Sequence, residues 1–256
     1  MGLTRGVAVV SIASAIGCSP TTQPAEAEKG GAPPGDSGTP SGSEVQVWGS
    51  LRSVMHEGKT EGNVALQSVV PGPHAYAIGA LSGLRGEITV LDDDVIVSFG
   101  ESAGAVRTPA QAAQGETATL LVRAVVPRWI NHQVDHAIEA NRLDEELETI
   151  AKNAGLDVGS RIPMIIEASA KSLEWHVLAG LPDGGQSAHD GPRSVGKLSG
   201  AMVTLVGFFS RNDEGIFTHM GEHTHLHVVT SGDRMTGHVD AVTLEAGGIV
   251  RLPTRQ

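Results

Sequence analysis

Five of the eleven histidines lie between positions 219 and 238. His223, His225 and His227 alternate in a segment rich in β-branched residues, so a strand would direct all three imidazoles to one side. His238 follows eleven residues after His227, beyond a Ser-Gly-Asp turn, and opens a second β-rich run. Two strands joined by a turn would therefore bring three or four imidazoles to one place.

A cluster of imidazoles with this spacing favours a metal site. Neutral imidazole is a preferred ligand of zinc and other late first-row divalent metals. Three imidazoles with an open fourth position are typical of a catalytic rather than a structural zinc site. Buried histidines without a metal would carry a desolvation cost and would repel one another on protonation. The alternatives are a solvated polar strand face, or histidines that are hydrogen-bonded in a core.

Composition limits the fold and the partners. At 256 residues the chain could form one large domain or two small ones. Aromatic residues make up only 3% of the chain, so Val, Ile, Leu and Ala must build the core. The 33 glycines and 13 prolines indicate many turns and short elements, which favours a β-rich fold. A formal net charge of −11 argues against nucleic acid or an anionic membrane surface as a partner.

The N-terminal residues 1–18 are typical of a targeting segment. Arg5 supplies a basic start, and residues 6–17 form an apolar run that is too short to span a bilayer. Small residues precede Cys18, as at a bacterial lipoprotein cleavage site, and Cys18 is the one cysteine in the sequence. We therefore expect Cys18 to be acylated; the alternative is an ordinary cleaved signal peptide with an incidental cysteine.

Residues 19–43 are rich in Gly, Pro, Ser, Thr and Glu and cannot form a core. The sequence predicts a flexible tether there and a globular domain over residues 44–256. A lipid on Cys18 would be the membrane contact of an exported cell-envelope protein, on the periplasmic or cell-surface side.

Hydrophobic periodicity predicts an α+β fold: β-rich, with mixed or antiparallel sheets, one substantial helix, and the metal site on a β-hairpin near the C-terminus. A short helix is expected over Val45–Met55 and the main helix over Asn131–Ala154, with loops at Thr108–Gly115 and Gly180–Gly196. The expected strands before the histidine hairpin are Tyr76–Ile78, Glu87–Leu91, Val95–Ser98, Thr117–Val126, Met164–Ala168, Leu173–Val177 and Ala201–Phe209.

The histidine motif and four further segments resemble the α-acetolactate decarboxylase family, in family order, from about Val45 to Pro253. The motif is His-Leu-His at 225–227, then Gly-His-Val-Asp at 237–240. The other matching segments are residues 78–87 with the following Leu-Asp, 121–125, 206–208 and 251–253.

The resemblance implies that His225, His227 and His238 bind Zn²⁺, and that Glu87 and Arg123 are the active-site glutamate and arginine. Read without the family, Glu87 would be an ordinary surface carboxylate. Arg123 lies in an otherwise apolar run and would need an anionic partner, either a substrate or an internal carboxylate.

The activity that the resemblance implies is decarboxylation of 2-acetolactate, an α-hydroxy-β-keto acid, to acetoin and CO2, by an enzyme of the carboxy-lyase class. Zinc would act as a Lewis acid, and Arg123 would help to stabilise the enediolate. The substrate is a small molecule, and a homodimer is compatible with the resemblance. Two alternatives remain: a non-catalytic zinc-binding surface lipoprotein on the same fold, in which His219 and His223 could assist zinc capture, and a cupin-like metalloenzyme.

The sequence departs from the family pattern at several positions. Ala80 stands where the family has a threonine, and His223 and Thr224 replace a glycine and an aromatic residue. The family's C-terminal tail glutamate has no counterpart in the sequence up to Gln256. The metal ligands are therefore expected to be retained, with fewer acid–base and substrate-orienting groups around them.

The lipoprotein interpretation predicts that a Cys18→Ser variant leaves the membrane fraction, because it lacks the acylated thiol. Fractionation of cells expressing each form, with N-terminal analysis of the mature protein, measures this. Unchanged membrane association, or a mature N-terminus far from residue 18, would contradict it.

Overall fold

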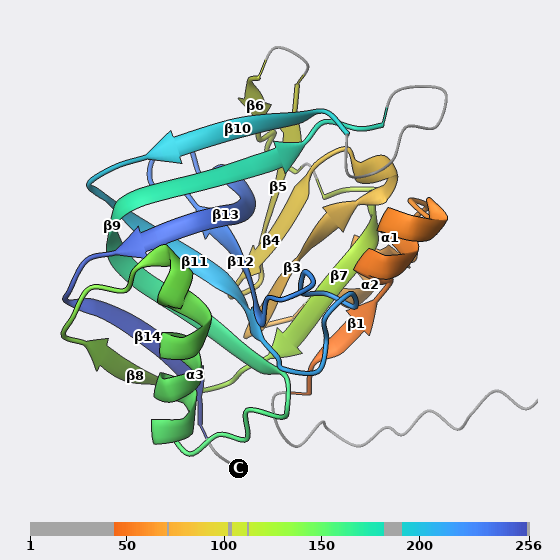
Figure 1. Ribbon diagram of the computed structural model, residues 1–256. Coiled ribbons are helices and arrows are strands. Elements are labelled where there is room, and N and C mark those ends of the chain that lie inside the picture. The colour runs from red at the N-terminus through yellow and green to blue at the C-terminus, as the bar shows by residue number, and fades with distance from the viewer. Residues whose placement is uncertain (1–43, 71, 102–103, 112, 182–190, 255–256) are drawn as a thin grey trace, which may run out of the picture. The chain divides into compact units, whose positions relative to one another are not determined.

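Figure 1 shows a computed structural model of the chain, which describes residues 44–70, 72–101, 104–111, 113–181 and 191–254. The predicted signal segment with Cys18, and the predicted tether, lie outside these residues. Within the described part of the chain, no helix combines the length and apolar character that a bilayer span requires.

Strands dominate, in two seven-stranded sheets whose named pairings are all antiparallel. The first sheet has the order β1-β7-β3-β4-β5-β6, with β2 also paired to β7. The turn between β4 and β5 is made by Asp92 and Asp93 at φ 51° and 70°, as a tight hairpin requires. The strands of this sheet are β1 Gln46–Trp48, β2 Val64–Ala65, β3 Ala75–Leu81, β4 Glu87–Leu91, β5 Asp94–Gly100, β6 Val106–Arg107 and β7 Thr117–Val125.

The second sheet has the order β11-β12-β13-β9-β14-β8, with β10 also paired to β9. The long strand β9 pairs with both β11 and β13, which β12 connects, so these four strands form a closed circuit of hydrogen-bonded neighbours. Its strands are β8 Trp129–Val134, β9 Ile162–Leu178, β10 Arg193–Leu198, β11 Ala201–Phe209, β12 Thr224–Val229, β13 Thr236–Leu244 and β14 Gly248–Pro253.

In the part of the chain that the structure describes, helices are few and short. The longest, α3 (Leu143–Asn153), has three acidic residues in its first turn and buries Leu147 and Ala151 against the second sheet. It lies beside β11 in Figure 1. The others are α1 (Leu51–Glu57), α2 (Leu66–Val69) and two single 3₁₀ turns at Ser82–Leu84 and Ala140–Arg142.

An apolar cluster joins the facing sides of the two sheets. Ile78 and Val122 of the first sheet belong to the same buried cluster as Ile165, Val206 and Phe208 of the second. These side chains stand at alternate positions of their strands, so each strand commits one face to the interface. The strand β13, which carries His238, approaches β4 and β5 across the same interface.

The β-rich α+β fold predicted from the sequence is confirmed, and two of the predicted helices need correction. The segment Val45–Met55 is β1 followed by α1, separated by Gly49 at φ 76°. The segment Asn131–Ala154 contains most of β8 before α3 begins, because β8 pairs with β14 along its whole length.

Two predictions about strands and loops also change. Met164–Ala168 and Leu173–Val177 are parts of the single strand β9. The predicted loop Gly180–Gly196 ends earlier, since β10 starts at Arg193 and pairs with the end of β9.

A substitution at Gly207 of β11 tests how closely β11 packs against β12, the strand that carries His225 and His227. A Cβ at Gly207 would overlap the backbone of β12, at the carbonyl oxygen of His225 and the Cα of Leu226. Gly207→Ala should lower the free energy of unfolding by about 1–3 kcal/mol, as overpacking does. Gly159→Ala is the matched control: its Cβ would lie 3.2 Å from a side-chain oxygen of Asp157 and away from other backbone, and we expect a change within about 0.5 kcal/mol. Equal denaturant midpoints for the two variants would contradict this packing.

Candidate metal centre

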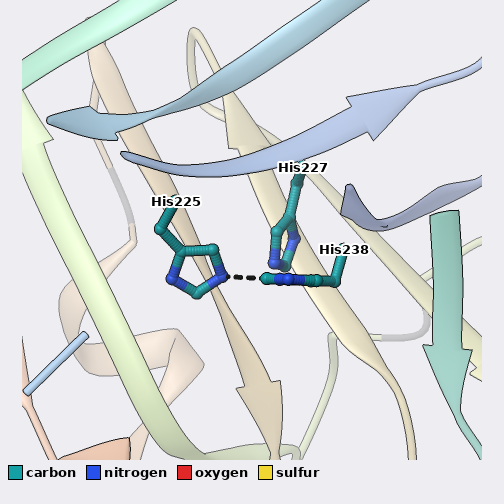
Figure 2. Close-up of side chains that lie close together, drawn as sticks. All are labelled: His225, His227 and His238. Carbon is teal, nitrogen blue, oxygen red and sulfur yellow. Dashed lines mark hydrogen bonds between the residues drawn. The ribbon is translucent and has the colours of Figure 1, made fainter. Parts of the chain in front are cut away.

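The strands β12 and β13 bring three imidazoles together between the two sheets. His225 and His227 are two positions apart on β12 and so share one face, and His227 is the cross-strand partner of His238 on β13. Figure 2 shows the three rings converging on one point. Their ligand nitrogens all lie within 4.8 Å of one another, which is close enough to share one ion.

Hydrogen bonds orient His225. Its Nδ1–H donates to the carbonyl oxygen of Phe217 at 2.6 Å, so its Nε2 carries the lone pair. That Nε2 faces Nδ1 of His238 at 3.0 Å, the contact dashed in Figure 2. A backbone carbonyl that fixes the far nitrogen of a histidine is a common support for a metal ligand.

His227 supplies the clearest sign that an ion fits here. Its Nδ1 lies 3.2 Å from Oγ1 of Thr89, which in turn lies 2.5 Å from Oγ1 of Thr236. Its Nε2 is buried and has no hydrogen-bond partner among the residues that the structure describes. A buried polar atom without a partner is costly, and a metal ion held by His225, His227 and His238 would satisfy it.

Burial keeps the three rings neutral, as metal binding requires. Desolvation lowers the pKa of His225 to about 3, with the neighbouring His219 adding to the effect. Desolvation also holds the pKa values of His227 and His238 well below the usual range, and the nearby imidazoles add to it. Each of the three neutral rings therefore keeps one nitrogen lone pair that can bind a cation at neutral pH.

The structure brings Glu87, at the start of β4, to the same place. Its side chain is 3% exposed, and its Oε2 lies 3.7 Å from Nε2 of His227. Burial raises the pKa of the Glu87 carboxyl well above its usual value, and the charge of Asp240 acts in the same direction. Glu87 is therefore a buried carboxyl group within reach of the metal position.

A cavity of about 140 Å³ opens beside the histidines. Both polar and aliphatic side chains line it. The polar lining residues are Glu87, His176, Arg193, His219, His225 and His238. The aliphatic ones include Leu51, Val54, Leu84, Leu120 and Leu178. This is the composition of a small-molecule site: mostly apolar, with a few convergent polar groups.

The structure does not bring Arg123 to the histidines. Leu120 lines the cavity and Val122 packs towards the second sheet, whereas Leu121 belongs to the cluster on the other face of β7. Because side chains alternate, Arg123 shares the face of Leu121. There its Nη1 donates to Oε1 of Gln46 at 3.3 Å. The predicted contact of Arg123 with a substrate is therefore not supported by its position; the arginine that lines the cavity is Arg193.

The remaining histidines also differ from expectation. His223 precedes β12, and its Nδ1 lies 3.8 Å from a carboxylate oxygen of Glu214 instead of joining the cluster. His219 does approach, with its ring 5.4 Å from that of His238. His176 on β9, which the sequence reading missed, lies 5.0 Å from the His238 ring and lines the cavity. A single histidine in an apolar strand carries no spacing signal that could have identified it.

Metal binding through these rings predicts that His227→Ala loses a stoichiometric zinc ion, because one of three ligands is removed. Zinc per chain, measured after dialysis against a weak chelator, tests this. His136→Ala, at an exposed histidine with carboxylate partners, is the control and should keep the metal. One zinc per chain in the His227→Ala protein would refute the ligand assignment.

The lowered pKa values also predict how the metal-free protein responds to acid. The folded pKa of His225 lies below the unfolded value of 6.5, so below pH 6.5 the unfolded chain takes up a proton that the folded chain does not. Stability present above pH 6.5 is therefore lost as the pH falls, by up to about 1.4 kcal/mol per unit for each such histidine. Urea unfolding at several pH values measures this slope, which should become shallower in His225→Phe. A slope unaffected by that change would contradict the buried neutral state.

Neither a protein-family model nor a curated protein sequence matches this chain. Solved structures do match it. An α-acetolactate decarboxylase from Bacillus subtilis strain 168 superposes with a TM-score of 0.67 at 15% identity, over 82% of this chain and 86% of that one. Acetolactate decarboxylase from Bacillus subtilis subspecies spizizenii gives 0.66 at 16% identity, over 83% and 86%. A Staphylococcus aureus protein of unknown function similar to that enzyme gives 0.60 at 16% identity, over 81% and 84%. The chain thus has the fold of the α-acetolactate decarboxylases, as its sequence motifs predicted.

Proposed function

We propose that this protein is a zinc-dependent decarboxylase of 2-acetolactate or a closely related α-hydroxy-β-keto acid. The observation that carries the proposal is the unpartnered Nε2 of His227, close to the neutral imidazoles of His225 and His238, both of which line the cavity. Three neutral imidazoles that leave a coordination position open are the donor set of catalytic zinc. The shared fold and the presence of Glu87 in the same cavity add support.

Bound zinc would supply Lewis acidity, which stabilises the charge that develops when CO2 leaves. The chain's own residues do the rest. Leu51, Val54 and Leu120 exclude water from the reacting carbons, which strengthens every polar contact inside the cavity. Glu87, whose burial favours the protonated form, holds a proton on its carboxyl group close to the metal position, where a carbanion or enediolate needs one.

Arg193 takes the place that the sequence had suggested for Arg123. It lines the cavity from the first residue of β10, and its guanidinium suits the carboxylate of an acidic substrate. Arg123 keeps a structural role on the far face of β7, beside Gln46.

A non-catalytic zinc-binding protein is the second candidate, and one distance favours it. Oε2 of Glu87 lies 3.7 Å from Nε2 of His227, so a small movement could make Glu87 a fourth ligand and close the site. Export as a lipoprotein anchored through Cys18 stays part of the proposal under either function.

Glu87→Gln tests the enzymatic proposal, because glutamine keeps the shape of the side chain but cannot hold the acidic proton. Acetoin formed from racemic acetolactate by the zinc-loaded protein should fall about 10²–10⁴-fold, with zinc content unchanged. Arg123→Lys, on the other face of β7, should retain activity within about twofold.

Three results would count against this assignment. If the zinc-loaded wild type forms no acetoin, the metal-binding alternative replaces the enzymatic one. Loss of zinc in Glu87→Gln would make Glu87 a ligand. Loss of activity in Arg123→Lys with zinc retained would restore the arginine role that the sequence suggested.

A further inference from the structure

We propose that His176, held in place by Asp240, accepts a hydrogen bond from the α-hydroxyl group of the substrate and so selects hydroxylated acids. The inference rests on the proposed function for the identity of the substrate. Its physical basis is a histidine that lines the cavity, lies outside the ligand set and has its orientation fixed by a carboxylate.

The position of His176 follows from strand register. It lies near the C-terminal end of β9, where it is the cross-strand partner of His238 on β13. Its ring centre lies 5.0 Å from that of His238, and the residue is 9% exposed. Because His176 lines the cavity, it would contact a molecule that fills it.

Asp240 fixes which nitrogen of His176 carries the proton. Nδ1 of His176 lies 2.7 Å from Oδ1 of Asp240. A carboxylate oxygen accepts, so Nδ1–H of His176 donates to Asp240 and the lone pair of the imidazole is on Nε2. Asp240 also lines a separate cavity of about 270 Å³, so it holds the ring from outside the site.

His176 therefore offers the cavity a hydrogen-bond acceptor that lies outside the set of metal ligands. The three nitrogens within 4.8 Å of one another belong to His225, His227 and His238, and His176 is not in this group. Arg193, which lines the same cavity, has only donors to offer.

The substrate class has the complementary set of groups. The carboxylate and the ketone of an α-hydroxy-β-keto acid can only accept hydrogen bonds. Its hydroxyl group is the one donor, so the fixed acceptor on His176 matches the hydroxyl group. A site that hydrogen-bonds a substrate hydroxyl discriminates against the analogue that lacks it, since its own polar atom is then left unpaired.

The test compares two unreactive acids that differ at one group. 2-Hydroxy-2-methylbutanoate carries the tertiary hydroxyl, and 2,2-dimethylbutanoate has a methyl group in its place. Neither has a ketone, so neither is decarboxylated. Titration calorimetry of the zinc-loaded full chain gives the ratio of their dissociation constants, and chelator competition gives the affinity for zinc.

The wild type should prefer the hydroxy acid, and His176→Phe should reduce that preference about tenfold while its zinc affinity stays within a factor of about three. His176→Gln, whose amide oxygen can still accept, should recover part of the preference. His136→Phe removes an exposed histidine that also pairs with a carboxylate. It should change neither the preference for the hydroxy acid nor the affinity for zinc.

The alternatives give different results. A large loss of zinc affinity in His176→Phe would make His176 a fourth ligand and overturn the inference. An unchanged preference with zinc intact, or a wild type that shows no preference, would overturn it as well. If the preference depends on His176 but the wild type makes no acetoin from acetolactate, the proposed activity fails while the hydroxyl site stands.

Discussion

The register of β13 between its two neighbours is the constraint on which the site depends. On one side β13 sets His238 against His227 of β12, and on the other it sets His238 against His176 of β9. A shift of one residue would turn these side chains to the opposite face of the sheet. The register between β13 and β9 shifts at a bulge between Val239 and Ala241. Bulges of this kind often re-aim side chains near functional sites.

The two sheets divide the work of building the site. The second sheet supplies the imidazoles, and the first supplies Glu87, Ala80 and Leu120. The helix α1 completes the cavity, and its position is fixed by backbone bonds. The amides of Leu51 and Arg52 donate to the carbonyls of Ile216 and Gly215, at 2.8 and 2.7 Å. The same segment continues into Phe217, whose carbonyl oxygen accepts from His225, so one segment contacts both α1 and a metal ligand.

The histidine hairpin could be predicted from the sequence because its signal is local: alternation on one strand and a return across a short turn. The sequence could not show on which face of β7 Arg123 lies. Both faces of β7 are buried, so its sequence is apolar on either side, and no alternation of polarity shows which positions face the cavity. Glu87 was found through the family motif, since a single carboxylate at a strand start has no distinctive pattern.

Long-range pairing explains the remaining differences. Val134 and Ile138 are spaced like a helical face, but β8 instead pairs with β14, more than a hundred residues later. His176 becomes part of the site only because β9 is long enough to pair with β13 after passing β11 and β14. Such contacts depend on the assembled sheet and leave no mark in the residues that surround one position.

The central claim is that three imidazoles hold one metal ion and leave a coordination position open towards the cavity. A crystal structure of the zinc-loaded protein, with the metal located by anomalous scattering, tests it most directly. The account predicts zinc bonded to His225, His227 and His238 at about 2.0–2.1 Å, with water or a small anion in the remaining position. Zinc at another place, or with Glu87 or His176 completing a closed shell of protein ligands, would contradict it.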